Sequence, residues 1–179
     1  MKLFAMWVVA GMALAASTLT AAAGCEAEFQ GTWQTGETGD FTAEAFTRGP
    51  TCDRAVAVIV LRDPTGDIVH QEALPAGYVA TLAGRAGADE MKSALAEWAD
   101  PAKSAYQRAH ELPKWPKGAD ATEGDFPFMA EEGIDRDAYE AIRKADGPVF
   151  CYVQGMESMS CLGIVDGVLR PLGVQMFPG

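Results

Sequence analysis

The sequence predicts an α+β fold, with a mainly antiparallel β-sheet and about three helices inserted between its strands. Strand patterns precede residue 75, where they form N-terminal hairpins, and follow residue 148, where they form a three-stranded meander. Helical periodicity is confined to the segment between them, and short turns such as Asp166-Gly167 join successive strands. Strands that are grouped apart from the helices are typical of the α+β class. Two-residue turns are typical of strands that are antiparallel neighbours.

Residues 1–23 have the layout of a secretory signal peptide. Lys2 precedes an apolar run, and the segment ends in alanines with Ala21 and Ala23 in the A-x-A cleavage pattern. No stretch after it approaches the roughly 20 apolar residues of a membrane-spanning helix. We therefore expect residues 24–179 to form a single exported domain without an integral membrane segment. We expect this domain to belong to a bacterial protein that is periplasmic or secreted.

The charge of the chain argues against two classes of partner. Removal of residues 1–23 takes away Lys2 and no acidic residue, so 13 basic and 25 acidic residues leave a formal net charge of −12. Nucleic-acid backbones and anionic membrane surfaces would repel such a chain. The sequence thus predicts no nucleic-acid partner. The negative charge is explained by its effect on solubility, since charged chains repel one another.

The four cysteines predict two disulfide bonds, because exported chains meet an oxidising compartment. A hairpin centred on Met156 puts Cys151 directly opposite Cys161. Cys25 and Cys52 then form the second pair. In an alternative interpretation, Cys25 is the lipid-bearing first residue of a lipoprotein, which would leave Cys52 without a partner. The lipoprotein motif usually has a larger aliphatic residue where this chain has Ala22.

Cys25 and Cys52 flank a first predicted hairpin. A three-residue loop, Glu37-Thr38-Gly39, pairs Trp33 with Ala43 and places Gly39 where a positive φ is needed. A two-residue loop would pair Trp33 with Glu44 instead. We expect the first register.

Two more strands follow. Residues 55–61 are continuously apolar and rich in β-branched side chains, which predicts a strand covered on both faces. Residues 63–66, Asp-Pro-Thr-Gly, have the composition of a turn, and residues 68–74 return as the next strand. The C-terminal meander is predicted at 149–154, 158–165 and 168–176.

Three helices are predicted in the middle of the chain. The first begins at an Asp89 cap, the second runs from Asp100-Pro101 to about His110, and the third begins at an Asp135 cap. The first carries an apolar stripe of Met91, Ala94, Leu95 and Trp98. The third has an expected apolar face of Ala138, Ala141, Ile142 and Ala145.

The connection over residues 112–133 contains the candidate binding residues. Trp115 lies between two prolines and is flanked by Lys114 and Lys117. An exposed tryptophan in a stiff loop could anchor a protein or small-molecule partner. Alternatively, Trp115 covers the core while the lysines remain in solvent.

No catalytic, metal or cofactor site is predicted. His70 and His110 are the only histidines, and bridged cysteines leave no thiol for Cys/His catalysis. The chain lacks the G-x-S-x-G, H-E-x-x-H and C-x-x-C motifs and a phosphate-binding glycine loop. The sequence favours a non-enzymatic binding, inhibitory or envelope-accessory protein. The alternatives are a periplasmic hydrolase whose acid–base pair assembles only in the fold and a lipid-anchored envelope protein.

Overall fold

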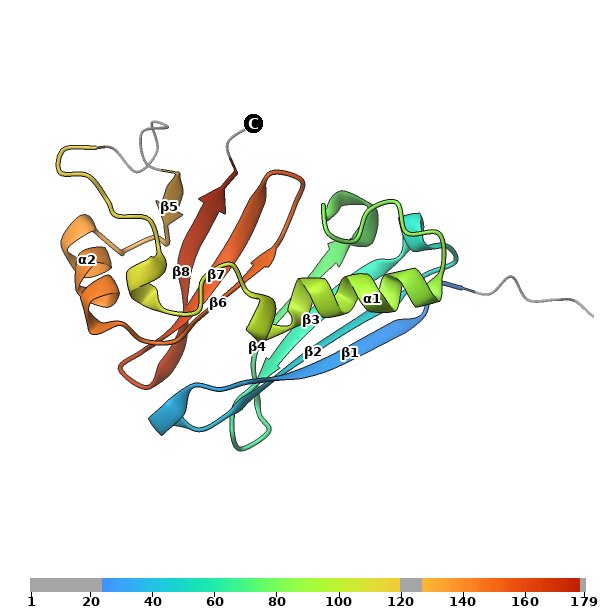
Figure 1. Ribbon diagram of the computed structural model, residues 1–179, viewed down its shortest axis with the longest axis horizontal. Coiled ribbons are helices and arrows are strands. Elements are labelled where there is room, and N and C mark those ends of the chain that lie inside the picture. The colour runs from blue at the N-terminus through green and yellow to red at the C-terminus, as the bar shows by residue number, and fades with distance from the viewer. Residues whose placement is uncertain (1–23, 120–126, 178–179) are drawn as a thin grey trace, which may run out of the picture.

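The computed structural model describes residues 24–119 and 127–177, and it has the predicted α+β class with antiparallel sheets (Figure 1). Within these residues two α-helices are present rather than three. The expected signal peptide and residues 120–126 of the long connection lie outside the described residues.

The strands form two four-stranded sheets. The first sheet has the order β1-β2-β3-β4 and the second has the order β5-β8-β7-β6, with every neighbouring pair antiparallel. The strands are β1 (Ala27–Trp33), β2 (Phe41–Arg48), β3 (Val56–Arg62), β4 (Ile68–Pro75), β5 (Phe128–Ala130), β6 (Val149–Val153), β7 (Ser158–Val165) and β8 (Val168–Met176). The helices are α1 (Ala88–Ala99) and α2 (Arg136–Ala145). Neither helix is long and apolar enough to cross a membrane, and no other described segment is such a helix.

Both predicted disulfide bonds are confirmed. Cys151 and Cys161 are direct partners in the β6–β7 register, and their sulfurs are 2.06 Å apart. Cys25 and Cys52 are bonded at 2.11 Å, just outside the ends of β1 and β2. The Asp166-Gly167 turn is also as predicted, since both residues have positive φ.

The predicted register of the first hairpin is wrong. Trp33 pairs with Phe41 rather than with Ala43, and the loop takes up residues 34–40. The observed register brings the rings of Trp33 and Phe41 edge to face at 5.7 Å between centroids. Aromatic contact of this kind outweighs the shorter turn. Gly39 has the expected positive φ of 87°.

The predicted helix between Asp100 and His110 is absent. The Asp100 carboxylate does cap a first turn by accepting from the Ala102 N–H, but only the short 3-10 turns Pro101–Lys103 and Ala109–Glu111 form. Between them the chain passes along β6 with one isolated β-bridge, from Arg108 to Pro148, and the Val149 N–H donates to the Gln107 carbonyl at 3.0 Å. The backbone groups at the edge of the second sheet are satisfied in this way, which a helix could not do.

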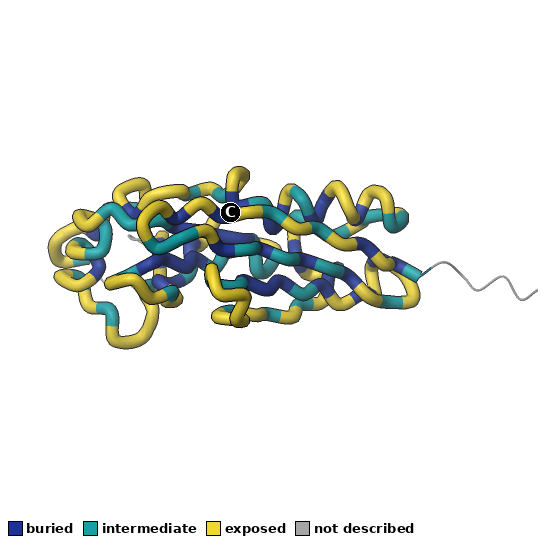
Figure 2. The backbone as a smooth tube through the Cα atoms, turned by 90° about the horizontal axis from the view of Figure 1, so that it is seen from below, coloured by how far each residue is buried: buried dark blue, intermediate teal, exposed yellow. Residues whose placement is uncertain are grey.

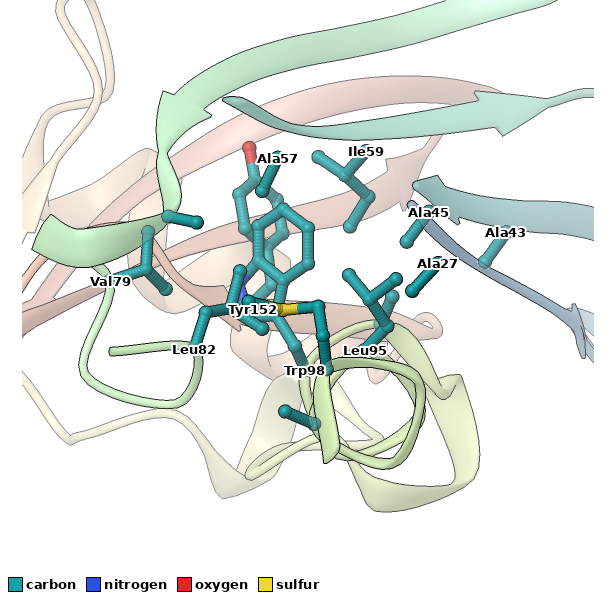
Figure 3. Close-up of a cluster of buried hydrophobic side chains, with 14 of the residues drawn as sticks. Ala27, Ala43, Ala45, Ala57, Ile59, Val79, Leu82, Leu95, Trp98 and Tyr152 are labelled. Carbon is teal, nitrogen blue, oxygen red and sulfur yellow. The ribbon is translucent and has the colours of Figure 1, made fainter. Parts of the chain in front are cut away.

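The helix α1 covers the first sheet. Its predicted apolar stripe is buried, but it begins at Ala88 with Gly87 as N-cap, so the predicted Asp89 cap is wrong. Figure 3 shows Leu95 and Trp98 pointing from α1 toward the alanine side chains of the sheet. Small residues at Ala43, Ala45 and Ala57 let the helix approach the strands closely. Figure 2 shows buried positions concentrated inside and exposed positions outside.

One core cluster joins the two sheets. Besides residues of α1 and the first sheet, it contains Phe150 and Tyr152 of β6 with Leu162 and Ile164 of β7. The opposite face of the second sheet packs in a second cluster with α2 and Trp115. The second sheet therefore lies between two apolar clusters and is covered on both faces.

The predicted apolar face of α2 is wrong in three of four positions. Ala138, Ala141 and Ala145 are exposed, and Tyr139 is instead the buried residue. The Tyr139 hydroxyl donates to the Pro113 carbonyl at 2.8 Å. A large ring whose polar tip finds a partner buries more apolar surface than alanine methyl groups can.

The strand β5 lies within the predicted connection 112–133 and was not expected. Met129 pairs with Val174 of β8, and the chain crosses Gly173 so closely that a Cβ atom there would lie 2.2 Å from the Met129 carbonyl oxygen. Only glycine permits this close approach, because it has no Cβ atom. The φ of 143° at Gly173 would in addition be strained for any other residue.

We expect Asp135→Ala to lower the free energy of unfolding by about 1 kcal/mol, the usual effect of removing an N-cap. The Asp135 carboxylate accepts from the Ala138 N–H at 2.8 Å and caps α2 as the sequence predicted. Urea unfolding followed by circular dichroism would measure the change. Asp137→Ala, in the same turn but 95% exposed, is the control. Equal losses in both variants would contradict the capping role.

Candidate functional site

A half-buried polar cluster joins the two sheets at His70. The Nε2 atom of His70 lies 2.8 Å from the hydroxyl oxygen of Tyr152, and this hydroxyl also donates to the Glu72 carboxylate. With the Tyr152 proton directed to Glu72, the His70 Nε2–H is the donor to Tyr152. The three side chains therefore form one chain of hydrogen bonds.

Strand geometry positions each member. His70 and Glu72 are two residues apart on β4, so both point to the same face of the first sheet, beside Leu61 and Ile59 in register. Tyr152 comes from β6 of the second sheet. Figure 3 shows its ring beside Trp98, with the hydroxyl directed toward the strands of the first sheet.

Burial dominates the electrostatics of this cluster. Desolvation lowers the pKa of His70 below its usual 6.5, while the nearby Glu72 carboxylate opposes the shift. Desolvation and the hydrogen bond to Glu72 raise the pKa of Tyr152. At neutral pH, His70 is therefore a neutral imidazole and Tyr152 a phenol.

The cluster can hold or transfer a proton, but within the described residues no thiol nucleophile is positioned on it. All four cysteines are in disulfide bonds, and the Nε2 atom of His70 contacts the Tyr152 hydroxyl. Ser160 is the register partner of Tyr152 on β7. A nucleophile needs a base within direct hydrogen-bond reach, and here the Tyr152 hydroxyl occupies the Nε2 atom of His70.

His110 also has a carboxylate partner, but in an exposed position. Its Nδ1 atom lies 2.6 Å from an Asp146 oxygen, and the Arg108 guanidinium contacts the other oxygen at 3.1 Å. The His110 hydrogen bond is the largest cause that lowers the pKa of Asp146 to about 2. Asp146 ends α2 in the left-handed conformation, with φ of 56°. The group thus ties the 3-10 turn Ala109–Glu111 to the end of α2.

The candidate binding residues of the 112–133 connection differ in burial. Trp115 is 8% exposed and packs edge to face against Tyr139 at 5.7 Å, so its ring covers the second core cluster. Lys114 and Lys117 are exposed. The alternative considered from the sequence, in which the ring belongs to the core, is the arrangement that is present.

A surface not expected from the sequence has five exposed large apolar side chains near one end of the second sheet. We call it the methionine–aromatic patch: Tyr78, Met129, Met156, Met176 and Phe177. Tyr78 is 74% exposed and Met156 is 58% exposed. The sequence offered one signal for this surface, a methionine in the Gly155-Met156-Glu157 turn, because turn residues are usually polar.

Backbone hydrogen bonds hold the segments of the methionine–aromatic patch together. The Ala80 N–H donates to the Gly155 carbonyl at 3.1 Å, next to Met156. The Phe177 N–H donates to the Glu157 carbonyl at 2.8 Å. Met129 belongs to β5, which pairs with β8 just before Met176.

No group of three or more His, Cys, Asp or Glu side chains suited to a metal ion occurs among the residues described here.

We expect Tyr152→Phe to destabilise the protein by about 1–2 kcal/mol while the aromatic packing is retained. The change removes the only hydroxyl that links His70 to Glu72, and half-buried polar groups that lose a partner incur a desolvation penalty. Urea unfolding at neutral pH would measure it. Tyr106→Phe is the control. Unchanged stability of Tyr152→Phe would contradict the linking role.

We expect His70 to make the folded state less stable as the pH falls below about 6.5. Because its pKa is lower in the folded state, the unfolded chain takes up the proton first, so the stabilisation present above 6.5 is lost as the pH drops through the folded pKa. The free energy of unfolding measured between pH 8 and pH 5 should fall less steeply in His70→Gln. Identical slopes in His70→Gln and the native chain would exclude this contribution.

Comparison with known proteins gives no relative for this chain. No protein-family model matches the sequence, no curated protein resembles it, and no solved structure matches its fold.

Proposed function

We propose that the mature chain is an exported, non-enzymatic binding protein of the bacterial envelope, and that it binds an apolar segment of a partner protein at the methionine–aromatic patch. The single observation that carries this proposal is the exposure of five large apolar side chains from separate chain segments at one end of the second sheet. Clustered exposed apolar side chains mark interaction sites, whereas isolated ones are ordinary.

The composition of the patch indicates the kind of partner. Methionine side chains are flexible and polarisable, so they adapt to apolar partners of varied shape. Tyrosine and phenylalanine add large contact areas at a small entropic cost. Glu157, in the same turn as Met156, is the one acidic residue within the β6–β7 loop. An apolar helix or extended segment fits this surface better than a charged ligand.

The disulfide bonds support the proposed compartment. Two bridges are stable in the periplasm or outside the cell, and they are uncommon in the cytosol. The Cys25–Cys52 bond also uses the sulfur that lipidation would modify. This supports the unanchored form over the lipid-anchored one.

A hydrolase remains the second candidate, because His70 and Glu72 converge on one hydroxyl between the sheets. In that case His70 would act as the base, with Tyr152 and Glu72 orienting its ring. Ester hydrolysis by the purified chain that is abolished in His70→Gln would favour this candidate. Binding at the methionine–aromatic patch would be unaffected by the same change.

We expect Met156→Glu to weaken capture of a partner at least tenfold. A buried carboxylate opposite an apolar segment is costly to desolvate. The measurement is chemical cross-linking in envelope extract, followed by affinity determination with the captured protein. Val168→Glu is the matched control, since Val168 is 53% exposed but begins β8 at the opposite end of the β7–β8 hairpin, beside Val165.

The proposal requires that the captured protein be lost from Met156→Glu and kept by Val168→Glu. Recovery of the same proteins at equal affinity by both variants would show that the patch is not the binding surface.

A further inference from the structure

The outer face of the first sheet is a separate surface, which lies opposite the face covered by α1. Side chains alternate along each strand, and the core positions of β3 are Ala57, Ile59 and Leu61. The residues between them point away from α1. Val56 and Val58 are absent from both core clusters and lie on this outer face, whereas Val60, on the same side of the strand, is only 6% exposed.

Apolar side chains fill two adjacent rows on the β3–β4 half of this face, and Gln71 and Arg62 stand in the two rows beyond them. Phe46, Val58 and Ala73 form one row across three strands, and Val56 and Pro75 form the next. We call the set the outer apolar face: Phe46, Val56, Val58, Ala73 and Pro75. Val56 is 47% exposed. A continuous apolar row on an open sheet, in contrast to scattered residues, needs a partner to cover it.

The charged groups on the same face are balanced. Arg48 pairs with Glu28, and Arg62 pairs with Glu44 at 3.0 Å. The Arg48 guanidinium also lies 5.5 Å from the centre of the Phe46 ring. Two cations and two anions leave this face neutral, although the whole chain has a formal net charge of −11. An equally acidic molecule can therefore approach here without the repulsion it would meet elsewhere.

We propose that the outer apolar face is covered by the same face of a second copy of this chain, in a symmetric dimer that is independent of the methionine–aromatic patch. Two sheets stack face to face at roughly 10 Å, with interdigitating side chains. Symmetric dimers use one self-complementary surface twice. The neutral apolar face of an acidic chain meets both requirements.

The register shows which side chains a two-fold axis over β3 brings together. An axis parallel to β3 puts β2 of each copy over β4 of the other, so that Phe46 faces Ala73 and Glu44 faces Gln71. A large side chain then meets a small one, and a carboxylate meets an amide. The Arg62 side chains of the two copies meet at the end of β3, where each is paired with Glu44 of its own copy. In this arrangement, Val58 lies at the centre and faces the other copy's Val58.

Sedimentation equilibrium of the mature chain tests this inference. We expect a dimer that tightens as salt is added, because salt screens the repulsion between two acidic chains. Ala73→Arg and Val58→Arg should each be monomeric at concentrations where the native chain is dimeric, with circular dichroism unchanged. Val168→Arg, an exposed apolar position away from the first sheet, should remain dimeric.

Cross-linking gives a second readout that does not depend on destabilising the interface. All four native cysteines are bonded, so Val58→Cys introduces the only free thiol. A short bismaleimide should link two Val58→Cys chains and should not link two Val168→Cys chains. A native chain that stays monomeric at the highest attainable concentration, or equal cross-linking of both variants, would overturn the proposal.

Discussion

The contact between Trp98 and Tyr152 is the interaction on which the rest of the architecture depends. The rings meet edge to face at 6.0 Å, and the Trp98 indole N–H donates to the Val153 carbonyl at 2.6 Å. In this way α1, which lies on the first sheet, is bonded to the edge strand of the second. Because each large ring buries its apolar surface and satisfies its polar tip, the contact is both strong and directional.

The polar groups at the junction follow from that burial. Once Tyr152 is inside, its hydroxyl needs a partner, and His70 and Glu72 on β4 provide both an acceptor and a donor. A hydrophobic contact alone would let the two sheets slide, whereas this chain of hydrogen bonds specifies one arrangement. The cluster is therefore explained by structure, and any chemical role for His70 would be additional to it.

The two sheets differ in how their edges and faces are covered, and this difference determines which surfaces remain open to other molecules. The edge of β6 is covered by the segment around Gln107, and the Cys151 N–H donates to the Ser104 hydroxyl. The second sheet is thereby closed on both faces and along this edge. The first sheet has α1 on one face only, which leaves the outer apolar face for intermolecular contact.

The sequence by itself determined the features that depend on neighbouring residues: the Asp166-Gly167 turn, the Cys151–Cys161 register, the Asp135 cap and the apolar stripe of α1. Turn geometry, capping and helical periodicity act over a few residues, so they can be read locally. The tertiary structure decided what depends on distant partners. It placed residues 104–108 along the edge of β6 instead of in a helix, turned Tyr139 rather than the alanines of α2 inward, and buried Trp115. The link of His70 to Tyr152 spans 82 residues, and the methionine–aromatic patch and outer apolar face likewise exist only after separate segments meet. Local patterns cannot specify such contacts, because burial depends on which surfaces the fold brings together.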